Sequence, residues 1–424
     1  MVSRRTSTLI QLLGSAVVMQ ALLSASSLIA GLIMIRRTSD LQYGYYVLVL
    51  NAILLLVTLQ NSFIQPQLVV RITRADAAER AKVVGGLYRS QRRLWPIIAA
   101  AVVLGGILTW LAGLIHPATL LVLIAAAVAV SFALYREFFR MVLLGYRRPV
   151  DVLRADAVYV ALLLGGVVLA TLTSAPATVA ALSLGVAALI GGIQCSRALW
   201  RFEAWNIRGV PGILQAFAPL GIWAAGGASV HWLFSQGYNY MVAGMLHVSA
   251  VAAIAATRLT IMPINLLSTG LGTMMLPTAA AWLNTHGAPR VLRRMIVIAV
   301  CLGATAICYF AVVWLLRDWL FIHVLKKEFP QRDQLLLMWF AVGLATLLRD
   351  QLLYLLTVRE RFRLMSSLTL VCALVSFAIS YYGILHFGVM GALVGVLAGE
   401  LLNVGGLIIL SAIESQRRPA IAPA

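Results

Sequence analysis

The stretch Ala118-Thr-Leu-Leu-Val-Leu-Ile-Ala-Ala-Ala-Val-Ala-Val-Ser-Phe-Ala-Leu-Tyr135 contains no charged residue. A helix of about 20 such residues crosses the hydrocarbon core of a bilayer. Apolar runs of this kind recur about twelve times along the chain, which predicts a membrane protein with many spans. We place the spans at 9–35, 43–69, 94–115, 118–145, 150–173, 177–199, 212–235, 239–278, 291–315, 334–357, 364–385 and 388–412.

The composition agrees with this interpretation. Of the 424 residues, 62% are hydrophobic and only 11% are charged, whereas soluble domains contain about 25% charged residues. The first apolar run is too long for the core of a signal peptide and is interpreted as a spanning helix. The four cysteines form no CxxC pair, so we expect buried free thiols and neither a disulfide framework, a metal site nor a cofactor.

The net charge of +19 is explained by membrane topology, and no nucleic-acid partner is expected. Basic residues accumulate on the cytoplasmic side of membrane proteins. With the N-terminus inside, the inner segments hold 25 of the 33 basic residues and the outer connections hold six. This asymmetry predicts that both termini are cytoplasmic. The longest outer connection, residues 316–333, is too short for a soluble domain.

The chain also divides into two similar halves. Six spans lie in residues 1–210 and six in residues 211–424, and the second span of each half ends near a proline, Pro66 and Pro277. Two parallel six-helix halves are a known transporter design. The expected fold is therefore an all-α polytopic membrane protein, with about twelve helices in two parallel lobes around a central cavity.

Arg258 is the foremost candidate for ligand binding. It lies near the middle of the predicted span 239–278. An arginine at a helix centre costs about 2.5–3.5 kcal/mol on insertion scales, so it should face a wet cavity or an acidic partner. Its guanidinium suits phosphate, which it binds through a planar fork. The alternative is a structural ion pair with Glu400 or Asp156.

Three further charges lie in the spans of the second half. Arg349 and Asp350 are adjacent on a helix, about 100° apart, so we expect them to face different surroundings. Arg349 is a candidate substrate contact and Asp350 a structural partner. Glu400 lies within Ala398-Gly-Glu400-Leu-Leu-Asn403. It is either a proton or cation site or one member of a salt bridge between spans.

Other charges lie at the ends of spans in the first half. Arg136 and Arg140 are four residues apart and share a helix face. They could meet a phosphate at the cytoplasmic entry or serve only as topology charges, with Asp156 as their natural partner. Arg36 ends the first span on the outer side, against the positive-inside trend, which favours a ligand role. Asp40 could neutralise it or take part in ion coupling.

The second span carries an unusual row of amides, namely Gln60, Asn61, Gln65 and Gln67. These side chains occupy about half of the helix surface. They could line a sugar-binding cavity or form hydrogen bonds between helices, which contribute about 0.6 kcal/mol each. The sequence leaves both possibilities open.

Several segments resemble the polysaccharide flippases of the multidrug/oligosaccharidyl-lipid/polysaccharide exporter superfamily, the Wzx-type O-antigen translocases. Arg36-Arg-Thr-Ser-Asp40-Leu-Gln-Tyr-Gly44-Tyr-Tyr46 is similar to the first outer loop of that family. The stretch His231–Pro277 is similar to its seventh and eighth spans, with Asn239 where members often carry an acidic residue. Members carry basic residues in a central cavity, which fits Arg258 and Arg36.

The resemblance implies a flippase of the bacterial inner membrane that is not an enzyme. Its substrate would have an undecaprenyl tail, a pyrophosphate and a short glycan. Membrane lipids are expected partners, and a polysaccharide polymerase and a chain-length regulator are further candidates. Three alternatives stay open: a drug/cation antiporter of the same superfamily, a membrane-embedded polymerase or glycosyltransferase, and an assembly partner that transports nothing.

Overall fold

The computed structural model describes residues 2–201, 212–329, 331–359 and 361–416, and every regular element within them is helical. The chain packs as two compact units, Met1–Ser229 and Val230–Ala424. The border between them lies inside a helix, α7 (Ile213–Met245). The lobe boundary predicted between residues 210 and 211 falls within residues 202–211, which lie outside the described residues. It therefore stays a prediction.

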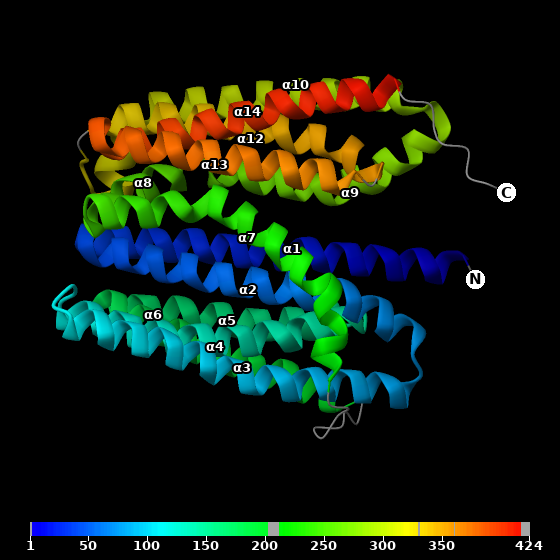
Figure 1. The fold of residues 1–424 in the computed structure, drawn as a ribbon, viewed down its shortest axis with the longest axis horizontal. Coiled ribbons are helices and arrows are strands. Elements are labelled where there is room, and N and C mark those ends of the chain that lie inside the picture. The colour runs from blue at the N-terminus through cyan, green and yellow to red at the C-terminus, as the bar shows by residue number, and fades with distance from the viewer. Residues whose placement is uncertain (1, 202–211, 330, 360, 417–424) are drawn as a thin grey trace. The chain divides into compact units, whose positions relative to one another are not determined.

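The first unit is a bundle in which α4 packs against α2, α3 and α6, while α5 packs against α1 and α6 (Figure 1). Its helices, besides the first part of α7, are α1 (Val2–Arg37), α2 (Asp40–Arg74), α3 (Ala77–Leu111), α4 (Pro117–Gly145), α5 (Pro149–Ala170) and α6 (Pro176–Trp200).

The second unit is built around α12, which packs against α8, α9, α10 and α14. Its helices, besides the rest of α7, are α8 (Val248–Leu259), α9 (Met262–His286), α10 (Ala288–Leu315), α11 (Arg317–Trp319), the π-helix η1 (Leu320–Leu325), α12 (Arg332–Val358), α13 (Phe362–Phe387) and α14 (Val389–Gln416).

Local sequence explains where the helices begin. Pro117, Pro149 and Pro176 each occupy the first turn of a helix, where the missing N–H costs no hydrogen bond. Ser39 and Asp76 cap α2 and α3 with side-chain oxygens that accept from backbone amides. These caps satisfy donors that the first helical turn leaves free.

The basic stretch 71–93, which lies between the spans predicted at 43–69 and 94–115, is mostly helical. α2 and α3 each contain 35 residues, with only Ala75 and Asp76 between them. At about 1.5 Å per residue, such helices exceed the roughly 30 Å hydrocarbon core of a bilayer. The arginines at this end are therefore carried on helical extensions, which hydropathy alone did not indicate.

The predicted eighth span, 239–278, is wrong as a single element. α7 continues to Met245, α8 ends at Leu259 after 12 residues, and α9 runs from Met262 to His286. Pro263 lies in the first turn of α9. Proline is tolerated in the first turn of a helix but disfavoured in its interior. Hydropathy does not indicate these two breaks, because the residues on both sides of each break are mostly hydrophobic.

Among the described residues, eleven helices are long and apolar enough to cross a membrane, and α8 is a shorter apolar helix. The expected all-α polytopic class is confirmed. The expectation of buried thiols holds for Cys195 and Cys372 but is wrong for Cys301 and Cys308, which are exposed on α10.

Small residues let α13 and α14 approach closely. A Cβ added at Gly395 would lie 2.1 Å from Ser380 Oγ and 2.4 Å from the Ser380 backbone nitrogen. Gly391 and Gly399, one turn away on either side, are equally crowded, by Gly383 and by Ser376. Such rows of small residues are typical of helix pairs in membranes.

Candidate functional site

A buried charge cluster joins α4 and α5 in the first unit. Arg136 Nη2 lies 2.5 Å from Asp156 Oδ1, and Arg140 Nε lies 3.2 Å from Asp156 Oδ2. Asp156 is fully buried. Both of its oxygens are therefore used by the two arginines that the sequence placed on one helix face.

The cluster extends to Asn61 of α2, and its neutral members are the Asn61 amide and the Tyr159 ring. Glu137 accepts from Arg140 Nη1 at 3.1 Å and from the Asn61 amide at 3.1 Å. The guanidinium of Arg136 lies 3.7 Å from the centre of the Tyr159 ring. Two arginines thus meet two carboxylates, so the net charge of the cluster is zero. Breaking one such pair would strand a buried charge, at a cost of about 3–5 kcal/mol.

The amides of α2 mostly connect helices. Gln60 donates to the Leu134 carbonyl at 3.0 Å and accepts from the Trp95 indole at 3.3 Å. Gln67 donates to the Phe217 carbonyl at 2.8 Å. Gln65 is exposed. Three of the four predicted amides, counting Asn61 in the cluster above, therefore have hydrogen-bond partners on neighbouring helices.

A second charge cluster links α12 and α14 in the second unit. Arg349 Nη1 lies 2.7 Å from Glu400 Oε1, and Arg349 Nη2 lies 3.0 Å from Asp350 Oδ1. Ser268 of α9 donates to Asp350 Oδ2 at 3.2 Å. As expected for adjacent residues, Arg349 and Asp350 reach different helices, Arg349 contacting α14 and Asp350 contacting α9. The long arginine side chain also folds back to Asp350, which the sequence did not indicate.

Arg258 has neutral neighbours instead. Its Nη1 donates to Gln236 Oε1 at 2.7 Å and to the Tyr238 hydroxyl at 3.1 Å. Its guanidinium carbon lies 5.4 Å from the centre of the Trp339 ring. Within the part of the chain that the structure describes, Arg258 has no carboxylate at ion-pair distance. The alternative partners named above are occupied, Glu400 by Arg349 and Asp156 by Arg136.

The location of Arg258 differs from the expected helix centre. It lies in the last turn of α8, one residue before the helix ends at Leu259. A cation is favoured there because the carbonyl end of a helix carries partial negative charge. The break also exposes backbone oxygens, one of which, at Thr260, accepts from the Tyr309 hydroxyl at 2.7 Å. The end of α8 therefore favours the Arg258 cation although it has no acidic partner among the described residues.

Arg36 lies at the exposed C-terminal end of α1, and Asp40 lies in the first turn of α2. The helix dipole favours both charges at these positions, because Arg36 is a cation at a carbonyl end and Asp40 is an acid at an amide end. Local helix electrostatics thus account for these residues, and their ligand role stays a proposal.

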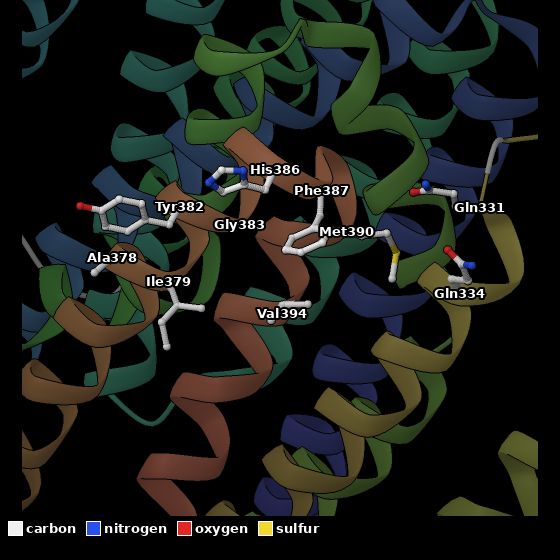
Figure 2. A pocket seen from close by; sticks show the side chains of 10 residues that line it. All are labelled: Gln331, Gln334, Ala378, Ile379, Tyr382, Gly383, His386, Phe387, Met390 and Val394. Atoms are coloured by element: carbon white, nitrogen blue, oxygen red, sulfur yellow. The ribbon is translucent and has the colours of Figure 1, made fainter.

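A pocket of about 940 Å³ lies in the second unit, away from every candidate predicted from the sequence. Figure 2 shows Gln331 and Gln334 from the start of α12 on one side, with Tyr382, His386 and Phe387 from the end of α13 among the other lining residues. Most of the lining is apolar. Sequence patterns did not indicate this pocket because its residues come from helix ends far apart in the chain.

Comparison with solved structures shows which fold this is. An inward-facing multidrug resistance MATE transporter of the MOP superfamily matches with a TM-score of 0.76 at 13% identity, over 94% of this chain and 96% of that one. An outward-facing structure of a multidrug resistance MATE transporter matches with a TM-score of 0.65 at 12% identity, over 96% and 95%. The chain therefore has the fold of MATE transporters of the MOP superfamily.

A MOP superfamily transporter from Pyrococcus furiosus, described as having a binding pocket of reversed polarity that suggests a different function, matches with a TM-score of 0.66 at 13% identity, over 96% of this chain and 95% of that one. No protein-family model matches the sequence. No curated protein matches it either.

Proposed function

We propose that this chain is a transporter of the bacterial inner membrane that flips undecaprenyl-pyrophosphate-linked oligosaccharides for surface polysaccharide synthesis. Alternating access by two helical lobes would expose the cargo to each side in turn. The fold supports transport, and the neighbours with this fold are transporters rather than enzymes. The cargo is inferred from one site.

The observation that carries the cargo is the charge at Arg258. The arginines of the two buried charge clusters, Arg136, Arg140 and Arg349, are each neutralised by a carboxylate. Arg258 is held by an amide, a hydroxyl and an indole ring, which orient the guanidinium without cancelling its charge. A phosphate would supply the missing anion, because guanidinium binds phosphate through two parallel hydrogen bonds.

Arg258→Ala is expected to reduce glycan export at least about tenfold while the protein still inserts, because a charge-assisted hydrogen bond contributes about 1.5–3 kcal/mol. Arg258→Lys should be partly active, since lysine keeps the charge but lacks the fork. Export is measured by complementation of a deletion strain, and the exposed Arg363→Ala is the matched control. Normal export by Arg258→Ala would show that Arg258 is not a substrate contact. Full activity of Arg258→Lys would show that charge alone suffices.

A drug/cation antiporter is the second candidate, because solved structures with this fold include multidrug transporters. A cationic drug would be repelled by an uncompensated arginine, whereas the reversed pocket polarity of the Pyrococcus neighbour supports different cargoes on one fold. The deletion strain separates the two. A flippase defect leaves lipid-linked units on the inner leaflet, whereas an antiporter defect raises drug sensitivity and leaves those units unchanged.

A further inference from the structure

A basic pocket lies between α9 and α10 in the second unit. It has a volume of about 540 Å³ and is lined by Trp282, Arg290, Arg293, Arg294, Val297 and Ile298. Arg293 and Arg294 lie three and four residues after Arg290, so both are neighbours of Arg290 on the surface of α10. Arg294 lies with its guanidinium carbon 4.7 Å from the centre of the Trp282 ring.

No carboxylate among the described residues balances the positive charge of this pocket. Within the described residues, none of its three arginines forms an ion pair with a carboxylate, and the first turn of α10 contains no acidic residue. Arg290 lies in that first turn, where the amide end of the helix adds further positive potential. An anion placed there would be favoured by the arginines and by the helix end together.

The surface next to the arginines is apolar. Ile296, Val297 and Val300 follow on α10 with 47%, 56% and 62% of their surfaces exposed. In a polytopic membrane protein, such exposed aliphatic side chains face lipid tails. The pocket therefore lies where a cationic band meets the lipid-facing surface, at the end that the charge asymmetry predicts to be cytoplasmic.

We propose that this pocket binds the headgroup of an anionic phospholipid, with the phosphate on Arg290 and Arg293 and the acyl chains along Val297 and Val300. Basic pockets at the cytoplasmic ends of spanning helices are known to hold such headgroups. A free phosphate would use only the arginines, whereas a lipid uses both the charged and the apolar parts. The binding is independent of the transported cargo.

The test uses the purified full-length protein and native mass spectrometry, with dioleoyl phosphatidylglycerol as the probe and dioleoyl phosphatidylcholine as the neutral comparison. The variant Arg290→Gln/Arg293→Gln is expected to bind phosphatidylglycerol about tenfold more weakly, from two lost charge-assisted contacts. The control Arg92→Gln/Arg93→Gln removes the same charge from exposed positions on α3 and should bind as the wild type does.

Equal weakening in both pairs would overturn the proposal, because it would show only general attraction to a basic protein. Displacement of the lipid by millimolar inorganic phosphate would also overturn it, in favour of a free-anion site. If the glutamine pair fails to fold, Arg290→Lys/Arg293→Lys keeps the charge and should still bind several-fold more weakly, because lysine lacks the planar fork. Unchanged affinity in the lysine pair would contradict the assigned contacts.

Discussion

At the scale of single residues, the Arg349–Glu400 pair should behave as a structural unit. Arg349→Leu leaves Glu400 buried at 5% exposure without its 2.7 Å partner, and we expect a loss of about 3–5 kcal/mol. Adding Glu400→Leu should recover part of this loss, because the more deeply buried carboxylate is then no longer left without its cation. Asp350, whose side chain is 30% exposed, still loses its contact with Arg349, so the recovery is incomplete. Thermal unfolding of the two single variants and the double variant in detergent measures the coupling.

If the double variant loses as much free energy of unfolding as the two single variants together, the pair is not coupled. A change in the dependence of transport on proton motive force in Glu400→Gln would instead favour ion coupling at this carboxylate. Both readouts are needed because stability alone does not distinguish a structural ion pair from a titrating site.

Sequence reasoning found the partners of some charged residues and missed those of others. Helical spacing put Arg136 and Arg140 on one face, and Asp156 was the expected partner, which the ion pairs bear out. The neighbours of Arg258 were missed, although Gln236 and Tyr238 lie only 22 and 20 residues before it in the chain. A break between α7 and α8 brings them together, and no charge pattern marks that break.

At the scale of elements, the contact between α13 and α14 depends on Gly395. A leucine there would meet the Ser380 backbone nitrogen at a Cβ distance of 2.4 Å, and the helix backbone cannot move away without separating the pair. We expect Gly395→Leu to destabilise the protein by about 3 kcal/mol or to prevent folding. Size-exclusion chromatography and thermal unfolding in detergent measure this effect.

Gly405→Leu is the matched control, because a Cβ at Gly405 of the same helix meets no atom within 4 Å. It should fold as the wild type does. Equal behaviour of the two variants would mean that the close approach of α13 and α14 is not needed for stability.

The elements were predictable where a span is flanked by polar residues and not where apolar residues continue through a break. The spans 118–145 and 150–173 agree closely with α4 and α5, because Pro117 and Pro149 mark the starts of these helices. In the run 239–278, no proline marks the break at Leu246. Pro263 does mark the start of α9, but the sequence alone does not distinguish it from prolines such as Pro66 and Pro96, which lie inside helices. Hydrophobicity measures preference for lipid, which is the same for a continuous helix and for a broken one.

At the scale of the whole molecule, the number of apolar runs and the charge asymmetry were enough to predict the fold class, whereas they could not predict how helices pair within each unit. Pairing depends on contacts such as Gly395 with Ser380, which are short-range and leave no period in the sequence. The sequence resembles the superfamily to which the matched MATE transporters belong, and the three-dimensional likeness, at 13% identity, adds that the fold is that of MATE transporters.

The charge asymmetry predicts which end of the molecule faces the cell interior, and this orientation can be measured. In a chain whose four cysteines are replaced by serine, Lys326→Cys places a thiol at an exposed position after η1, and Arg293→Cys places one at an exposed position on α10. A membrane-impermeant maleimide should label the first in intact cells and the second only after the membrane is permeabilised. The physical reason is that basic residues are retained on the cytoplasmic side. Labelling of the α10 position in intact cells would reverse the orientation, and with it the leaflet assigned to the basic pocket.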